Sequence, residues 1–299
     1  MSVPPPFQHP GPPPARPELP EGVTPPEPPR APDGLPPLGV PVWAPFAGLL
    51  ATFLIVLVAG VIVGIVFGIG GADLESGDSD TGISLVLTGI QAFVLVAVAW
   101  YSAELLSGRR PTPAAFGLRE TRLWPALGMT ALAYVGFWVV TIIVVSALGE
   151  PDEQQLVQDI QDEQTLVVLI GFGVLSCFLA PLAEEFFFRG FMFRALAERI
   201  HPIWAAIVAG GVFGVIHLPG SPATSVLVLS FLGVALCLLL WRTGSLIPCI
   251  MLHSLNNSIS FSATKELPWW GFLLVIAGSV GTTLAVSLLV ARAASPARA

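Results

Sequence analysis

The sequence predicts an all-α membrane protein of about eight transmembrane helices, preceded by a disordered proline-rich tail. Three observations support this fold class. Hydrophobic residues make up 54% of the 299-residue chain and charged residues only 11%, whereas charged residues make up about 25% of a soluble domain. The mean hydropathy is +0.79. The chain also contains eight apolar runs, each close to the roughly 20 residues that a helix needs to cross a bilayer.

The first 43 residues form the least hydrophobic part of the chain. They contain 17 prolines and no apolar run. Proline has no backbone donor and cannot continue a helix, so we expect residues 1–43 to be a disordered, partly polyproline II tail. A basic stretch followed by an apolar one is missing, which argues against a cleavable signal peptide. Residues 293–299 are expected to form a short tail at the other end.

The apolar runs follow the proline-rich tail and together define a membrane domain over residues 44–292. Tryptophans fall near the ends of most runs, where amphipathic rings lie at the membrane interface. No internal repeat is visible, so the inverted-repeat architecture of many transporters gains no support. The helices are expected at residues 44–69, 83–105, 124–148, 166–194, 203–218, 223–241, 244–262 and 269–292.

The charges of the links predict an orientation. Links 70–82 and 149–165 carry four and six acidic residues and no base, whereas link 106–123 carries four arginines. Positively charged links stay in the cytoplasm. We therefore expect a multi-pass protein of the cell membrane with both termini cytoplasmic. The net charge of −7 reflects these acidic links, and it does not point to nucleic acid as a partner.

Charged residues interrupt the fourth apolar run, where Glu184, Glu185 and Arg189 lie. Ionisable groups at membrane depth are costly and are usually functional. Glu185 and Arg189 are four residues apart and can pair on one helical face, which leaves Glu184 free. The alternative interpretation is a buried ion cluster that only holds helices together.

Two later runs also carry polar residues. His217 ends the fifth run, and His253 and Asn257 share a helical face in the seventh. A single intramembrane histidine is usually an interhelical hydrogen-bonding group. A rise of about 1.5 Å per residue, however, brings these residues and Glu184 to similar depths. We therefore expect one cavity in the cytoplasmic half of the bilayer.

These residue types allow hydrolysis. A glutamate beside a histidine can take a proton from water and return it to a leaving amine. A second histidine with an asparagine amide can stabilise an oxyanion. Glutamate and histidine are also zinc ligands, so a divalent metal such as zinc remains an alternative way to activate the water. HExxH and GxSxG motifs are missing.

Three patterns in this region resemble the signatures of a known family. They are Glu184-Glu185-x-x-x-Arg189-Gly190, Phe213-x-x-x-His217 and His253-x-x-x-Asn257. They resemble the CPBP family of CAAX proteases and bacteriocin-processing enzymes, also called the Abi family, over residues 166–260. The resemblance implies a helical intramembrane endopeptidase that acts at the bilayer on a peptide or lipidated protein.

The resemblance also implies roles for individual residues. Glu184 and His217 would activate the attacking water, and His253 and Asn257 would stabilise the oxyanion. Glu185, Arg189 and Phe213 would support the site. Family members were first described as metalloproteases; a metal, if used, would be held by Glu184, His217 and His253.

Two other functions fit the sequence less well. A non-catalytic bacteriocin-immunity or membrane scaffold protein could use the same polar cluster for binding. A transporter or proton relay could use the two glutamates and the histidines. No motif in the sequence indicates that the protein recognises a prenyl chain, and none identifies a substrate.

Overall fold

The computed structural model describes residues 35–69, 77–149, 154–163 and 165–293. These residues form helices joined by short links, and no strand occurs among them. The predictions for residues 1–34 and 294–299, and for parts of the two acidic links, fall outside the described residues. The elements are α1 (Ala44–Ile69), α2 (Gly77–Ser107), η1 (Pro113–Phe116), α3 (Leu123–Leu148), α4 (Gln155–Asp162), α5 (Leu166–Val174), η2 (Leu175–Leu179), α6 (Ala180–Glu184), η3 (Glu185–Phe193), α7 (Arg194–Ala197), α8 (Pro202–Val215), η4 (Leu218–Gly220), α9 (Ala223–Thr243), α10 (Leu246–Thr264) and α11 (Trp269–Ala293).

The predicted fold class is confirmed. Among the described residues, seven helices are long and apolar enough to cross a membrane. One of them runs without interruption from α5 to α7 over residues 166–197. The eighth expected helix is α10, which has 19 residues. It is less apolar than the other seven because it carries a histidine, two asparagines and several serines.

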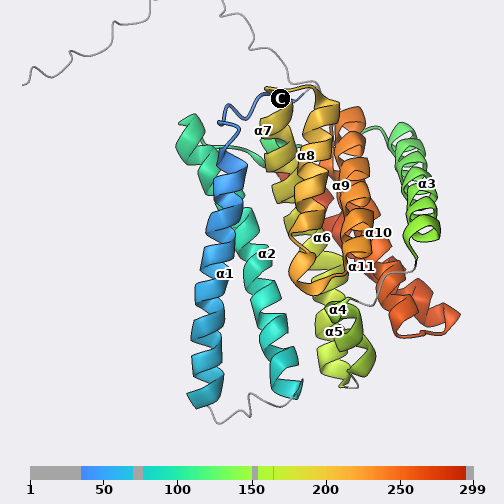
Figure 1. Cartoon of the computed structure of the whole chain (residues 1–299). Helices are drawn as coiled ribbons and strands as arrows, with labels where there is room; N and C mark the ends of the chain where they lie inside the picture. The colour runs from blue at the N-terminus through green and yellow to red at the C-terminus, as the bar shows by residue number, and fades with distance from the viewer. Residues whose placement is uncertain (1–34, 70–76, 150–153, 164, 294–299) are drawn as a thin grey trace, which may run out of the picture.

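The helices form a bundle in which the beginning and end of the described chain lie at the same end (Figure 1). A hairpin of α1 and α2 stands on one side, and α3 lies at the opposite edge (Figure 1). The hairpin of α8 and α9 turns well above the far ends of α1 and α2 (Figure 1). This short hairpin places the end of α8, and therefore His217, inside the depth of the bundle.

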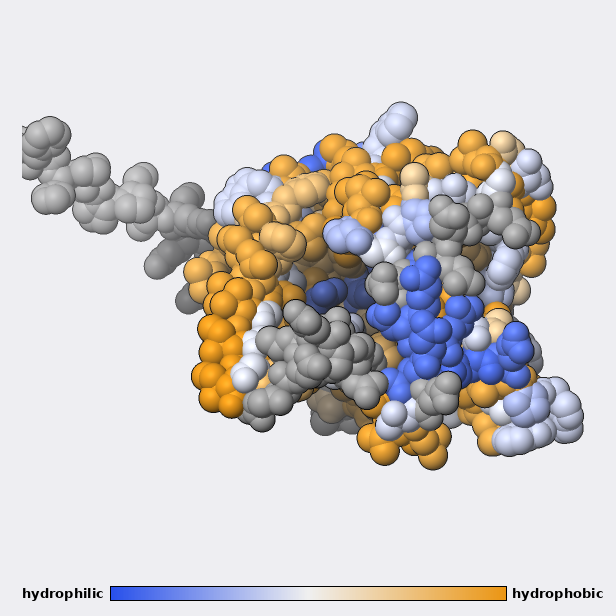
Figure 2. Space-filling model, turned by 60° about the horizontal axis from the view of Figure 1, so that its bottom comes forward, coloured by the Kyte–Doolittle hydropathy of each residue, from blue (hydrophilic) through white to orange (hydrophobic). Residues whose placement is uncertain are grey.

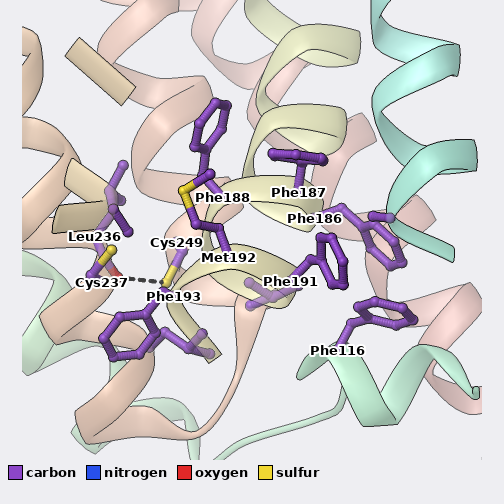
Figure 3. Packing of buried hydrophobic residues seen from close by; sticks show 14 of the residues in the cluster. Phe116, Phe186, Phe187, Phe188, Phe191, Met192, Phe193, Leu236, Cys237 and Cys249 are labelled. Carbon is purple, nitrogen blue, oxygen red and sulfur yellow. Dashed lines mark hydrogen bonds between the residues drawn. The ribbon is translucent and has the colours of Figure 1, made fainter. Parts of the chain in front are cut away.

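The core is centred on η3, a nine-residue π-helix in which every residue is buried. It packs against α1, α2, α8, α9 and α10. Phenylalanine rings fill most of the space around it (Figure 3). The ring of Phe116 from η1 lies 4.4 Å from that of Phe186. Cys249 on α10 donates to the carbonyl of Leu236 on α9 at 3.4 Å. The charged residues of η3 are thus enclosed by an apolar shell.

Glycines allow α8 and α9 to pack closely. A Cβ added to Gly210 would lie 2.5 Å from the backbone nitrogen of Val234, and one added to Gly233 would lie 2.7 Å from the Cα of Gly210. Small residues at such a crossing let two membrane helices approach by their backbones. The close approach brings the carbonyl of Gly233 within 3.4 Å of Arg189 Nη2 on η3.

Residues 35–43 differ from the predicted tail because they pack onto the bundle. Leu35, Leu38 and Val40 are buried. Glu198, just after α7, accepts hydrogen bonds from the backbone nitrogens of Leu38 and Gly39. Apolar residues scattered among prolines gave no periodic pattern, so the sequence alone did not reveal this contact.

The opposite end of the bundle carries α4, a short helix that was not predicted within the acidic link. Lys265, just after α10, donates to the carbonyls of Gln161 at 3.2 Å and Glu163 at 2.9 Å. Ile160 is buried, whereas Gln158 and Asp162 are exposed. Hydrophilic surface gathers in a patch beside a hollow at this end, and hydrophobic surface covers the flanks (Figure 2).

Candidate active site

A fully buried ion pair forms the base of the site. Arg189 Nη1 lies 2.8 Å from Glu185 Oε1, and both side chains are completely buried. This confirms the predicted pairing of these residues. Glu185 Oε1 also contacts His253 Nδ1 at 2.8 Å. Two side chains, Arg189 from η3 and His253 from α10, therefore share one carboxylate oxygen of Glu185.

The bond to Glu185 determines how His253 is oriented. An ionised carboxylate only accepts hydrogen bonds, so His253 Nδ1 must carry the hydrogen. In the neutral imidazole the other nitrogen, Nε2, then has a free lone pair. A carboxylate that holds a functional histidine in this way fixes both its tautomer and its ring plane. Glu185 thus fixes the orientation of the His253 imidazole.

Glu184 lies on the other side of the same imidazole. Its Oε2 is 3.8 Å from His253 Nε2, and its side chain is 14% exposed, compared with none for Glu185. A distance of 3.8 Å exceeds the range of a direct hydrogen bond but suits two groups bridged by one water. Of the two adjacent glutamates, Glu184 is therefore the one whose carboxylate is partly accessible.

The ring of Phe213 on α8 contacts both histidines and Arg189. The centroid of the His217 ring lies 5.1 Å from it, and that of His253 lies 5.8 Å from it. Arg189 stacks over the same ring, with its Cζ 4.4 Å from the centroid. Phe213 thus connects both predicted histidines to the buried ion pair.

His217 is held by its own helix. Its Nδ1 lies 2.7 Å from the carbonyl oxygen of Phe213. A carbonyl can only accept, so Nδ1 donates and Nε2 is left for another partner. The structure brings His217 to the same aromatic ring as His253, but it is His253 that contacts Glu184.

Asn257 points toward the fourth span. Its Nδ2 donates to the carbonyl of Ser176 at 2.9 Å. One turn earlier on α10, Ser254 Oγ donates to the carbonyl of Cys177 at 2.6 Å. Sequence reasoning missed Ser254 and both carbonyls, because a serine in an apolar run gives no signal and backbone acceptors are invisible to motifs.

A metal was left open by the sequence, and the described residues provide a test. Among them, no three histidine, cysteine, aspartate or glutamate side chains converge as metal ligands. The Nδ1 hydrogen bonds of His253 and His217 leave both Nε2 atoms available as ligands. Among the described residues, however, these atoms do not converge with Glu184 on one point. Glu184, His217 and His253 therefore do not fit a three-ligand metal site in this arrangement.

Comparison with known families matches the segment that contains this site. Residues 166–259 match the family model described as Rce1-like, type II CAAX prenyl endopeptidase. No curated protein and no solved structure matches the chain. The matched segment runs from α5 into α10 and contains all the site residues predicted from the sequence. This match over residues 166–259 agrees with the resemblance to CAAX proteases that the sequence motifs indicate.

Proposed function

We propose that this CAAX-type intramembrane endopeptidase cleaves a peptide bond with one water molecule held between Glu184 and His253. The observation that carries the proposal is the 3.8 Å separation of Glu184 Oε2 and His253 Nε2, in a pair that is only slightly exposed. A water in this position can donate one hydrogen bond to the carboxylate and one to the imidazole. Its oxygen lone pairs then face the substrate carbonyl.

Glu184 is the general base in this proposal. Glu185 is already committed to Arg189 and His253, so a proton on it would break two charge-assisted contacts. Glu184 has no such commitment to a cation in this cluster and keeps some exposure. It takes the proton from the attacking water and returns it to the leaving amine, a contribution of about 10²–10⁴ in rate.

In this proposal the roles of His217 and His253 are the reverse of those that the family resemblance implies. His253 stands beside Glu184 and orients the water, with Glu185 behind it. His217 and Asn257 are the remaining groups for the oxyanion and the leaving group. Asn257 uses one amide hydrogen for Ser176 and keeps a second for the developing charge. No step uses a metal.

The substrate is proposed to be a membrane-associated peptide or lipidated protein. The helix ends near Arg122, Arg194, Arg242 and Arg292 lie at the same end of the bundle as the start of the described chain (Figure 1). We propose that this end is cytoplasmic, since positive charge stays on that side. Glu184 lies nearer to it than to the acidic end along the fourth span.

The test compares membrane proteomes of cells that carry the wild type or Glu184→Gln. The glutamine keeps the shape of the glutamate but cannot take a proton. We expect one or more uncleaved membrane proteins to accumulate with Glu184→Gln and not with the control Glu120→Gln. Glu120 is 54% exposed and pairs with Arg292 away from the site. Identical proteomes for wild type and Glu184→Gln, at equal expression, would contradict the proposal.

A further inference from the structure

The fourth span contains a backbone irregularity just before the two glutamates. The N–H of Ala180 bonds to the carbonyl of Leu175, five residues back, in place of the usual four. The next residue is Pro181, which has no N–H. The carbonyl of Ser176 therefore has no backbone donor at either spacing. The carbonyl of Cys177 loses the donor that lies four residues ahead of it.

Free carbonyls inside a membrane protein need other partners. Both partners come from one face of α10, where Asn257 donates to Ser176 at 2.9 Å and Ser254 donates to Cys177 at 2.6 Å. Ser254 is fully buried. The two carbonyls that lack backbone donors next to Pro181 thus receive donors from the neighbouring helix.

These two bonds lie next to the reacting groups. Ser254 directly follows His253, and Pro181 stands three residues before Glu184. A shift of α10 along or around its axis would break both bonds and also move His253 Nε2 relative to Glu184 Oε2. The bonds therefore fix the register in which the two atoms stand 3.8 Å apart.

We propose that Pro181 is a positioning residue. Because Pro181 has no N–H, the carbonyls of Ser176 and Cys177 accept hydrogen bonds from Asn257 and Ser254, and these bonds hold α10 in place. This sets the distance between the imidazole of His253 and the carboxylate of Glu184. The inference about helix contacts is independent of the proposed function; its catalytic consequence rests on that function.

The first test is a pair of double-mutant cycles read by thermal unfolding in detergent. Ser254→Ala and Asn257→Leu are each made with and without Pro181→Ala. In the wild-type background, each should lower Tm by about 2–4 °C, because each leaves a buried carbonyl without a donor. Pro181→Ala restores an N–H, which can reach Ser176 at the wide spacing or Cys177 at the normal one. In the Pro181→Ala background, the fall in Tm caused by either Ser254→Ala or Asn257→Leu should therefore be less than half of its value in the wild-type background.

Ser258→Ala is the matched control. Ser258 lies one turn beyond Ser254 on the same buried face, but its hydroxyl contacts the carbonyl of Ser254 and the hydroxyl of Ser279. Its effect on Tm should be the same with and without Pro181→Ala. The proposal is overturned if neither the Ser254→Ala loss nor the Asn257→Leu loss shrinks, or if neither variant lowers Tm.

The second test separates positioning from stability. Pro181→Ala should leave Tm unchanged or raise it, because proline is a poor residue for a helix interior. It should nevertheless lower kcat at least tenfold, with a smaller change in KM, for the membrane protein that accumulates with Glu184→Gln. Full kcat in Pro181→Ala would overturn the catalytic part. If no substrate accumulates, the proposed function fails while the Tm cycles still decide the helix contact.

Discussion

Replacing Arg189 by methionine is the perturbation for which the structure predicts the largest effect. Methionine has a similar length but no charge, so it leaves the carboxylate of Glu185 buried without its cation. Both side chains are completely buried. Removing one partner of a buried ion pair costs about 3–5 kcal/mol. The cation–π contact with Phe213 adds about 0.5–2 kcal/mol.

For this ion pair we expect the lower part of the range of about 3–5 kcal/mol. Glu185 Oε2 and Arg189 Nε are buried without a hydrogen-bond partner among the described residues. The pair is therefore less well satisfied than an ideal one. We expect Arg189→Met to reduce the free energy of unfolding by about 3–4 kcal/mol. For a domain of this size the reduction corresponds to a fall in Tm on the order of 10 °C.

The assay is thermal unfolding in detergent, followed by tryptophan fluorescence, with a second variant that isolates the charge. Glu185→Gln keeps an acceptor for His253 Nδ1 but removes the negative charge. The double variant Arg189→Met/Glu185→Gln should recover more than half of the loss. The reasoning is refuted if Arg189→Met alone changes the free energy of unfolding by less than about 1 kcal/mol, or if the two substitutions are simply additive.

Three further predictions follow from other contacts. Gly210→Ala should cost about 1–3 kcal/mol, because its Cβ would meet the backbone of α9, whereas Gly211→Ala has open space and should be neutral or slightly stabilising in the same unfolding assay. Glu198→Ala should cost about 1–3 kcal/mol and expose residues 35–43 to added protease, because the carboxylate holds two of their N–H groups; unchanged proteolysis would count against this contact. His217→Ala should lower the cleavage rate by about 10²–10³ with little change in Tm, since its side chain is only partly buried; full activity would remove His217 from the site.

The transmembrane helices were largely predictable because an apolar run of sufficient length is a direct physical signal. The predicted run 44–69 coincides with α1, and the run 244–262 lies within two residues of α10. The Glu185–Arg189 pair could also be predicted, because it depends on spacing within one helix. What the sequence does not contain is the rotation of one helix against another.

That rotation decides which histidine faces Glu184. His217 and His253 are equivalent in the sequence pattern, since each lies in an apolar run at a similar depth. In the structure His253 Nε2 lies 3.8 Å from Glu184 Oε2, and α10 contacts η2 through Ser254 and Asn257. The missing backbone donor at Pro181 is visible in the sequence, but its consequence depends on donors located more than 70 residues later.

The central claim is that Glu184 and His253 hold one water molecule for attack. An experimental structure at a resolution that shows ordered solvent would test it most directly. The account predicts a single water within about 2.7–3.2 Å of both Glu184 Oε2 and His253 Nε2, retained when His217 is replaced by alanine. The account is contradicted if the two atoms point away from each other, or touch directly with no solvent between them.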